Sequence, residues 1–152
     1  MSTVSSPGCV VFLMDESAGM GVVVEDVVAS GKATKSNAER VANALNALLN
    51  QLTQGPDFDV ALIGYQSDAA DEVDVGSRWG GALAGRDFVT TSELAASPLR
   101  VETRIRRVPV PGSVGMTSEE PMDFPVWYAP QLGAKAPQVA AYTRCRELLS
   151  SW

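Results

Sequence analysis

The chain contains no histidine among its 152 residues and only two cysteines, and both shortages exclude chemistry. Without histidine it has no Ser-His-Asp or Cys-His catalytic pair and no imidazole metal ligand. Cys9 and Cys145 lie far apart and match no zinc-binding or redox spacing. Each stands in an apolar pattern, so we expect both to pack as small buried side chains. Enzyme classes that depend on a catalytic histidine, including the Cys-His enzymes, are therefore excluded.

Positive charge and long hydrophobic runs are also scarce. The 12 basic and 18 acidic residues give a net charge of −6, and the short run Arg104, Arg106, Arg107 does not offset it. Such a chain is not expected to bind nucleic acid, because that binding depends on neutralising phosphates. The apolar run 9–14 has only six residues, too few for a membrane span, and no basic residues precede it. The sequence thus predicts a cytoplasmic protein without a membrane partner.

The first part of the chain contains a clear α/β pattern. A length of 152 residues with 45% hydrophobic and 20% charged residues is typical of one globular domain, residues 1–152. The run 9–14 (CVVFLM) is typical of a central parallel strand that is covered on both faces. Residues 35–52 repeat leucine and valine at helical spacing after Ser36 or Asn37 as a cap. Residues 58–65 (FDVALIGY) then predict a second buried strand, which completes a strand–helix–strand unit.

The second part is less regular. Residues 66–98 carry several acids and then the glycine-rich stretch SRWGGALAGRD. Residues 99–110 alternate apolar and charged side chains, which predicts a half-exposed strand near an edge. We expect a mobile loop over 112–124, and a helix over 139–152. Together these elements predict an α/β fold with a Rossmann-like open, mainly parallel sheet flanked by helices.

The end of the first strand carries an acid and a hydroxyl, Asp15 and Ser17, in the sequence DESAGM. One interpretation is structural: Asp15 caps a turn and Ser17 begins a helix. The other is a binding site, because ligands of open α/β sheets bind beyond the carboxyl ends of the strands. The strand, DESAGM, the helix and FDVALIGY together resemble the first half of a von Willebrand factor type A domain. SRWGGALAGRD and FPVWYAP resemble a bacterial branch of that family.

The resemblance implies a metal-ion-dependent adhesion site, with Asp15 and Ser17 as ligands of a divalent ion such as Mg²⁺. Other positions depart from the family pattern. Gly19 stands where a second serine is expected, Ala136 replaces the threonine of a later loop, and Lys135 places a cation nearby. The chain also ends at Trp152, before the strand that carries the last ligand of the family site. We therefore expect a degenerate site that binds Mg²⁺ weakly or not at all, and no other cofactor.

The resulting hypothesis is a non-enzymatic protein-interaction module that is part of a larger assembly. Because a half-built parallel sheet leaves a face or edge uncovered, we expect a protein partner or a homo-oligomer. The expected working surface is the top of the sheet: Asp15, Glu16, Ser17, the 66–80 loop and the 112–137 region. One alternative is a Mg²⁺-dependent binding domain whose metal site is completed by a partner chain. Another is a small α/β enzyme that uses Asp15 as its nucleophile.

Overall fold

The fold is described from a computed structural model, which describes residues 8–24 and 35–152. Its strands are β1 (Gly8–Asp15), β2 (Val23–Val24), β3 (Lys35–Ser36), β4 (Phe58–Ser67), β5 (Val73–Ser77), β6 (Phe88–Thr90), β7 (Arg100–Pro109) and β8 (Thr117–Val126). Its helices are α1 (Asn37–Leu52), α2 (Thr91–Ala96) and α3 (Gln138–Ser151), with short 3-10 turns at Ala18–Gly21 and Gly81–Leu83. The predicted first strand, long helix, second strand and last helix are all confirmed, with their ends within about two residues.

The main sheet is built around β4. On one side β1 runs parallel to β4, in the predicted order of strand, helix and strand. On the other side β5 and β6 share the edge of β4, and both run antiparallel to it. The α/β class is therefore confirmed, but a mainly parallel sheet is not. The reason lies after β4, where the chain turns back at once: the Asp68 carboxylate accepts the backbone N–H groups of Ala70 and Glu72, both at 2.9 Å.

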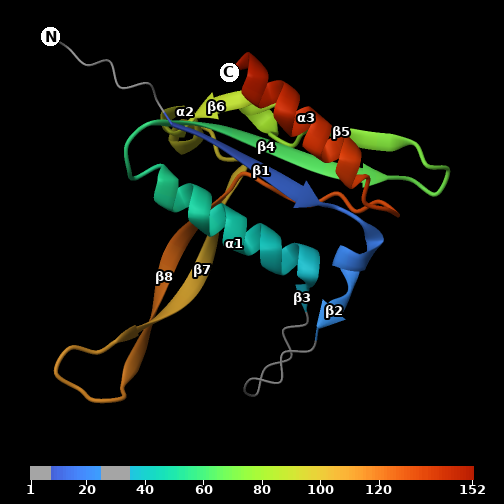
Figure 1. The fold of residues 1–152 in the computed structure, drawn as a ribbon. Coiled ribbons are helices and arrows are strands. Elements are labelled where there is room, and N and C mark those ends of the chain that lie inside the picture. The colour runs from blue at the N-terminus through green and yellow to red at the C-terminus, as the bar shows by residue number, and fades with distance from the viewer. Residues whose placement is uncertain (1–7, 25–34) are drawn as a thin grey trace, which may run out of the picture.

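Two helices cover opposite faces of this sheet (Figure 1). Alternate side chains of β1 and β4 point to the face covered by α1 and pack there: Phe12, Met14, Val60 and Leu62. The side chains between them point to the opposite face and pack with Leu148 of α3: Val11, Leu13, Ala61 and Ile63. This alternation explains the continuous apolar runs of both strands, because each face of the sheet has its own hydrophobic cluster.

Helix α1 begins at a capping box. The Ser36 hydroxyl accepts the backbone N–H of Glu39, and the Glu39 carboxylate accepts the backbone N–H of Ser36 at 2.7 Å. These two bonds satisfy donors that the first turn of a helix otherwise leaves unpaired. Of the two cap residues that the sequence suggested, Ser36 and Asn37, the structure shows Ser36 as the N-cap.

The segment 100–126 forms a separate two-stranded ribbon that extends away from the sheet beside α1 (Figure 1). Ten residue pairs join β7 to β8, from Arg100 opposite Val126 to Pro109 opposite Thr117. The strand predicted over 99–110 is confirmed. The mobile loop predicted over 112–124 is wrong, because most of it is β8. Prolines and acids concealed this strand in the sequence, since both are depleted in strands generally but tolerated in an exposed ribbon.

Candidate functional site

The loop after β1 holds Asp15 and Ser17 in a local turn. The Asp15 carboxylate Oδ1 accepts the backbone N–H of Ser17 at 2.8 Å, and Ser17 caps the 3-10 turn Ala18–Gly21 without a side-chain bond. Both side chains are half-buried. This arrangement is an Asx turn, the structural role that the sequence offered as one of its two interpretations.

A second loop reaches the same place from the far end of the chain. The Gly133 N–H donates to the Glu16 carbonyl at 2.7 Å, and the Ala18 N–H donates to the Ala134 carbonyl at 3.3 Å. Lys135 forms an isolated bridge with Ser67, at the end of β4. The structure therefore brings the loop that the family resemblance matched, which includes Ala136, next to the loop after β1.

The donor atoms gathered there do not fit a resident Mg²⁺ ion. Mg²⁺ requires near-octahedral oxygen coordination, and here Gly19 and Ala136 contribute no side-chain oxygen beside Asp15 and Ser17. The Lys135 ammonium pairs with the Asp71 carboxylate. Within residues 8–24 and 35–152, no group of three or more His, Cys, Asp or Glu side chains is placed to hold a metal ion. Metal binding by Asp15 and Ser17 with help from another chain stays a prediction.

The residue between them, Glu16, is the centre of a buried polar network. Its side chain is fully buried and accepts the Arg78 Nε–H at 2.8 Å and the Tyr128 hydroxyl at 3.0 Å. Arg78, itself nearly buried, also bonds to Asp74 at 3.0 Å. Burial, and then the negative charge of Glu16, raise the pKa of the Tyr128 phenol far above its usual value. The network ties together the loop after β1, the end of β5 and the segment after β8.

Glu16 was expected on the working surface together with Asp15 and Ser17, and that prediction is wrong. The strand pattern alone does not single out Glu16, because both of its alternating series are apolar and one leads to Asp15, the other to Glu16. Phe12 and Met14 point to the α1 face of the sheet, and a period of two continues this series to Glu16. Arg78 belongs to the 66–80 loop, which was also expected on the working surface, and its side chain is nearly buried. Its paired charge explains how a carboxylate is accommodated at this depth.

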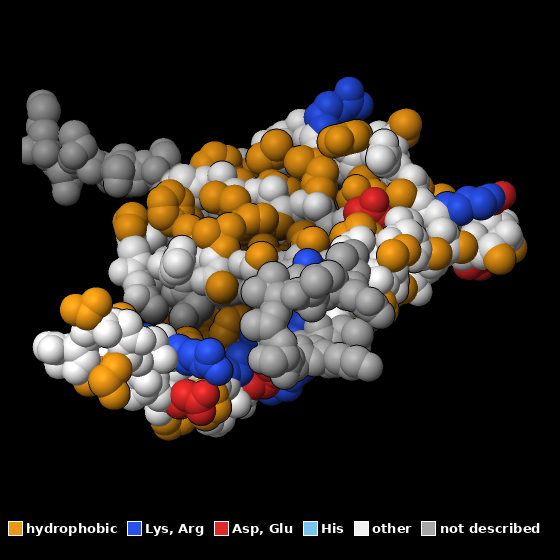
Figure 2. Space-filling model, turned by 90° about the horizontal axis from the view of Figure 1, so that it is seen from below, with side chains coloured by type: hydrophobic (Ala, Val, Ile, Leu, Met, Phe, Trp, Pro, Cys, Tyr) orange, Lys and Arg blue, Asp and Glu red, His pale blue; other side chains and the backbone are white. Residues whose placement is uncertain are grey.

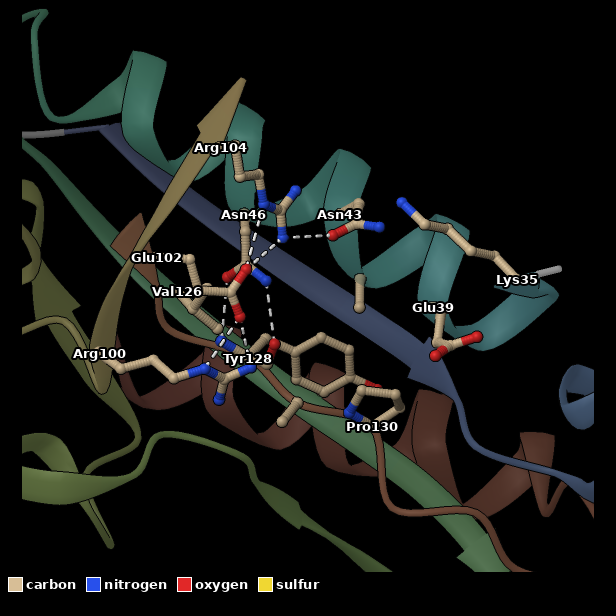
Figure 3. Close-up of a pocket in the computed structure, with 12 residues that line it drawn as sticks. Lys35, Glu39, Asn43, Asn46, Arg100, Glu102, Arg104, Val126, Tyr128 and Pro130 are labelled. Carbon is tan, nitrogen blue, oxygen red and sulfur yellow. Dashed lines mark hydrogen bonds and ion pairs between the residues drawn. The ribbon is translucent and has the colours of Figure 1, made fainter. Parts of the chain in front are cut away.

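A pocket of about 240 Å³ lies between α1 and the base of the ribbon (Figure 3). Three of its charged side chains, Arg100, Glu102 and Arg104, are paired with one another. The Glu102 carboxylate accepts bonds from Arg100 at 3.0 Å and from Arg104 at 2.7 Å. These bonds, that of Arg104 first, lower the pKa of Glu102.

Arg104 also fastens the ribbon to the body of the protein. Its Nη2 donates to the Asn43 side chain on α1 at 2.9 Å, and its guanidinium lies 3.5 Å from the centre of the Phe124 ring. Sequence analysis noted this arginine only as part of a short basic run. Arg104 therefore attaches β7 to α1 at this pocket.

The outer edge of β1 is open. Among the described strands β1 pairs with β4 alone. The Glu16 N–H bonds to the Tyr65 carbonyl, and backbone direction alternates along a strand, so the N–H and C=O groups of Cys9, Val11 and Leu13 point to the open side. Seen from below, hydrophobic side chains form one broad patch on the face of the molecule that carries α1 (Figure 2).

Exposed apolar residues of both helices border this edge. On α1, Asn43 and Asn46 bond to the ribbon and to the segment after it, so the opposite flank of the helix, with Val41 and Leu48, lies toward β1. On α3, Arg144 bonds to Asp87 next to β6, which leaves the flank with exposed Tyr142 and Leu149 on the side of β1. The open edge is thus lined by apolar side chains above and below.

Comparison with known proteins gave no match: no family model, no curated protein and no solved structure is significantly similar to this chain. The resemblance to von Willebrand factor type A domains therefore rests on the sequence pattern alone. None of the helices in the described part of the chain has both the length and the apolar character that crossing a membrane requires.

Proposed function

We propose that this chain is a non-enzymatic protein-interaction module that assembles with a second copy of itself through the open edge of β1. One observation carries the proposal. Strand β1 is apolar along its length and covered on both faces, yet among the described strands it is paired along one edge only. An open strand edge of this kind is a template for pairing with another chain.

The edge has none of the features with which proteins usually protect such strands. Between Gly8 and Met14 it carries no charge, no proline and no bulge, while its outward N–H and C=O groups remain unpaired in the described structure. An antiparallel pairing about Val11 would place Cys9 of one copy opposite Leu13 of the other, without like charges facing each other. The same twofold operation brings the Val41 and Leu48 flanks of two α1 helices together, and likewise the Tyr142 and Leu149 flanks of α3.

The resemblance to von Willebrand factor type A domains supports the same interpretation. Those domains are interaction modules, and the strand–helix–strand order that carries the resemblance is present here as β1, α1 and β4. The proposed surface differs from the one expected from the sequence. It is the edge of the sheet instead of its top, since Glu16 and Arg78 are occupied with each other.

Light scattering over a concentration series tests the proposal. We expect the wild-type protein to be a dimer at micromolar concentration and Leu48→Glu to be a folded monomer, because the new carboxylates would face each other across the interface. Val114→Glu is the matched control: it adds the same charge at a fully exposed position between β7 and β8 and should remain a dimer. A wild-type monomer at every concentration, or a dimer that Leu48→Glu leaves intact, would contradict the proposed interface.

A further inference from the structure

The two edges of the β7–β8 ribbon differ in their capacity to accept another strand. Antiparallel pairs alternate between hydrogen-bonded and non-hydrogen-bonded positions. The Val110 N–H donates to the Met116 carbonyl at 3.0 Å, which fixes the phase of this alternation. The pairs Ile105–Pro121 and Val101–Pro125 then fall at non-hydrogen-bonded positions, where backbone groups point outward. Proline is compatible with these positions because it has no N–H to donate.

On β8 this alternation places prolines at positions whose backbone N–H groups would otherwise point to the outer edge. Two outward positions, at Pro121 and Pro125, have no N–H group, so β8 is a poor template for a further strand. On β7 the outward positions Val101, Thr103, Ile105 and Arg107 each have an N–H and a C=O group, and only Pro109, at the end of the strand, lacks the N–H. Within the described structure these outward groups have no partner. The edge of β7 from Val101 to Arg107 is therefore a better template for a further strand than the edge of β8.

The face of the ribbon that turns away from α1 adds apolar contacts. Arg104 and Glu102 point toward α1, so Val101 and Ile105, at the alternate positions of β7, lie on the other face. Their side chains are 55% and 63% exposed. A strand laid along β7 would bury part of this surface next to its own alternate side chains.

Charge selects the kind of strand that fits. Strand β7 carries four arginines and one glutamate, whereas β8 carries Glu119, Glu120 and Asp123 and no basic residue. Arg106 and Arg107 form exposed ion pairs of 3.6 Å with the two glutamates of β8, and their exposed guanidinium groups have further donors that can bind the carboxylates of another strand. A second copy does not fit here, because its β7 would repel the first one and its β8 lacks outward donors at the prolines.

We infer that β7 is a docking edge for an extended acidic segment of a partner protein, which adds to the ribbon as a third strand. The backbone groups of Val101, Thr103, Ile105 and Arg107 supply the ladder, and Arg106 and Arg107 select carboxylates. This surface is separate from the β1 edge, so it goes beyond the self-association proposed above. Either one can fail without the other.

Fluorescence anisotropy with two labelled peptides tests the inference on the full chain. One peptide is eight residues of alternating valine and glutamate, and the other alternates valine and lysine. We expect the acidic peptide to bind, at least tenfold more tightly than the basic one, and less tightly as salt is added. Thr103→Pro removes one outward N–H from β7 without touching the ladder to β8, and should weaken binding at least tenfold.

Asp123→Pro is the matched control, since Asp123 lies directly opposite Thr103 and its N–H points to the other edge. It should leave the affinity within about twofold of the wild type. Circular dichroism checks that both proline variants fold. If Thr103→Pro does not fold, Arg106→Gln combined with Arg107→Gln replaces it and should weaken binding and flatten its salt dependence. Equal binding of both peptides, equal losses in the two proline variants, or no binding up to about 1 mM protein would overturn the inference.

Discussion

The phenol of Tyr128 donates a hydrogen bond to the carboxylate of Glu16 over 3.0 Å, although the two residues are 112 positions apart in the chain. Both side chains are buried, so the bond is not shared with bulk water. It joins the end of β1 to the segment after β8. The ribbon and the sheet, which share no strand pairing among the described residues, are connected at this point.

Gly64→Ala is predicted to break the Glu16 network. A Cβ at residue 64 would lie 2.5 Å from the Glu16 carboxylate and still closer to Arg78, so the buried ion pair must move apart. Because separating a buried pair leaves uncompensated charge, we expect unfolding free energy to fall by about 3 kcal/mol in urea denaturation.

Gly76→Ala is the matched control, because Gly76 is the cross-strand partner of Gly64. The nearest atom to its added Cβ would be 4.0 Å away, and we expect a change of no more than about 0.5 kcal/mol. Equal losses in the two variants would show that alanine in the sheet, not the ion pair, causes the effect.

Stability is predicted to decline at alkaline pH through Tyr128. Burial and the nearby Glu16 charge raise the pKa of this phenol in the folded protein, while the unfolded chain ionises near pH 10. Above that pH the unfolded state binds fewer protons than the folded state, so unfolding becomes more favourable as pH rises. The slope reaches about 1.4 kcal/mol per pH unit for one group.

Denaturation midpoints between pH 9 and pH 11 measure this slope. Tyr128→Phe should be less stable than the wild type at neutral pH, because it loses a bond to a charged acceptor worth about 2 kcal/mol. Its stability should then fall less steeply with pH. Tyr142→Phe, at an exposed position on α3, should retain the wild-type slope. A wild-type slope in Tyr128→Phe as well would assign the decline to other groups.

The sequence predicted those elements whose pattern is local. The apolar run of β1, the leucine spacing of α1 and the alternation of β7 each depend on neighbouring residues, and each element formed as expected. The antiparallel direction of β5 and β6 was missed because it depends on the segment after β4. A turn fixed by Asp68 replaced the helical crossover that a parallel strand needs.

The candidate site was predictable only in part, for a similar reason. The position of Asp15 and Ser17 beyond a strand is set by the local pattern, and so is their turn. The partners of Glu16 are not, since Arg78 and Tyr128 come from distant segments and only the folded chain brings them together. The strand β8 was missed because Pro121 and Pro125 oppose a central strand, and nothing local indicates a ribbon that tolerates them.

Asn46 is predicted to hold the segment after β8 in place. This buried side chain accepts the backbone N–H groups of Trp127 at 2.8 Å and Tyr128 at 3.0 Å, and donates to the Tyr128 carbonyl at 2.9 Å. Asn46→Leu leaves three buried backbone groups without partners. We expect an unfolding free energy lower by about 3 kcal/mol or more, measured by urea denaturation.

Asn50→Leu serves as the control for the change from amide to aliphatic side chain. Asn50 is one turn further along α1 and only half-buried, and its side chain makes no hydrogen bond in the described structure. The control should stay within about 0.5 kcal/mol of the wild type. A tolerated Asn46→Leu would mean that the segment is held by the packing of Trp127 and Tyr128 alone.

The last prediction concerns Mg²⁺ and Mn²⁺, the ions that Asp15 and Ser17 would bind if the metal alternative held. The Asp15 carboxylate already accepts the Ser17 N–H at 2.8 Å, and the neighbouring Glu16 carboxylate is bound by Arg78 and Tyr128. Gly19 contributes no side-chain oxygen. We therefore expect no rise in melting temperature at millimolar concentrations of either ion. An ion that binds only the folded protein must raise this temperature, so the measurement is direct.

Two variants give the experiment a sharp outcome. Asp15→Ala removes the carboxylate of the loop that is not bound to Arg78, and Asp71→Ala removes an exposed carboxylate that pairs with Lys135. Stabilisation by Mg²⁺ that Asp15→Ala abolishes and Asp71→Ala retains would establish the metal site and contradict the donor-set argument. Stabilisation lost in neither variant would place the ion elsewhere. Repeating the titration with Leu48→Glu tests whether a second copy completes the site, because that variant is expected to be monomeric.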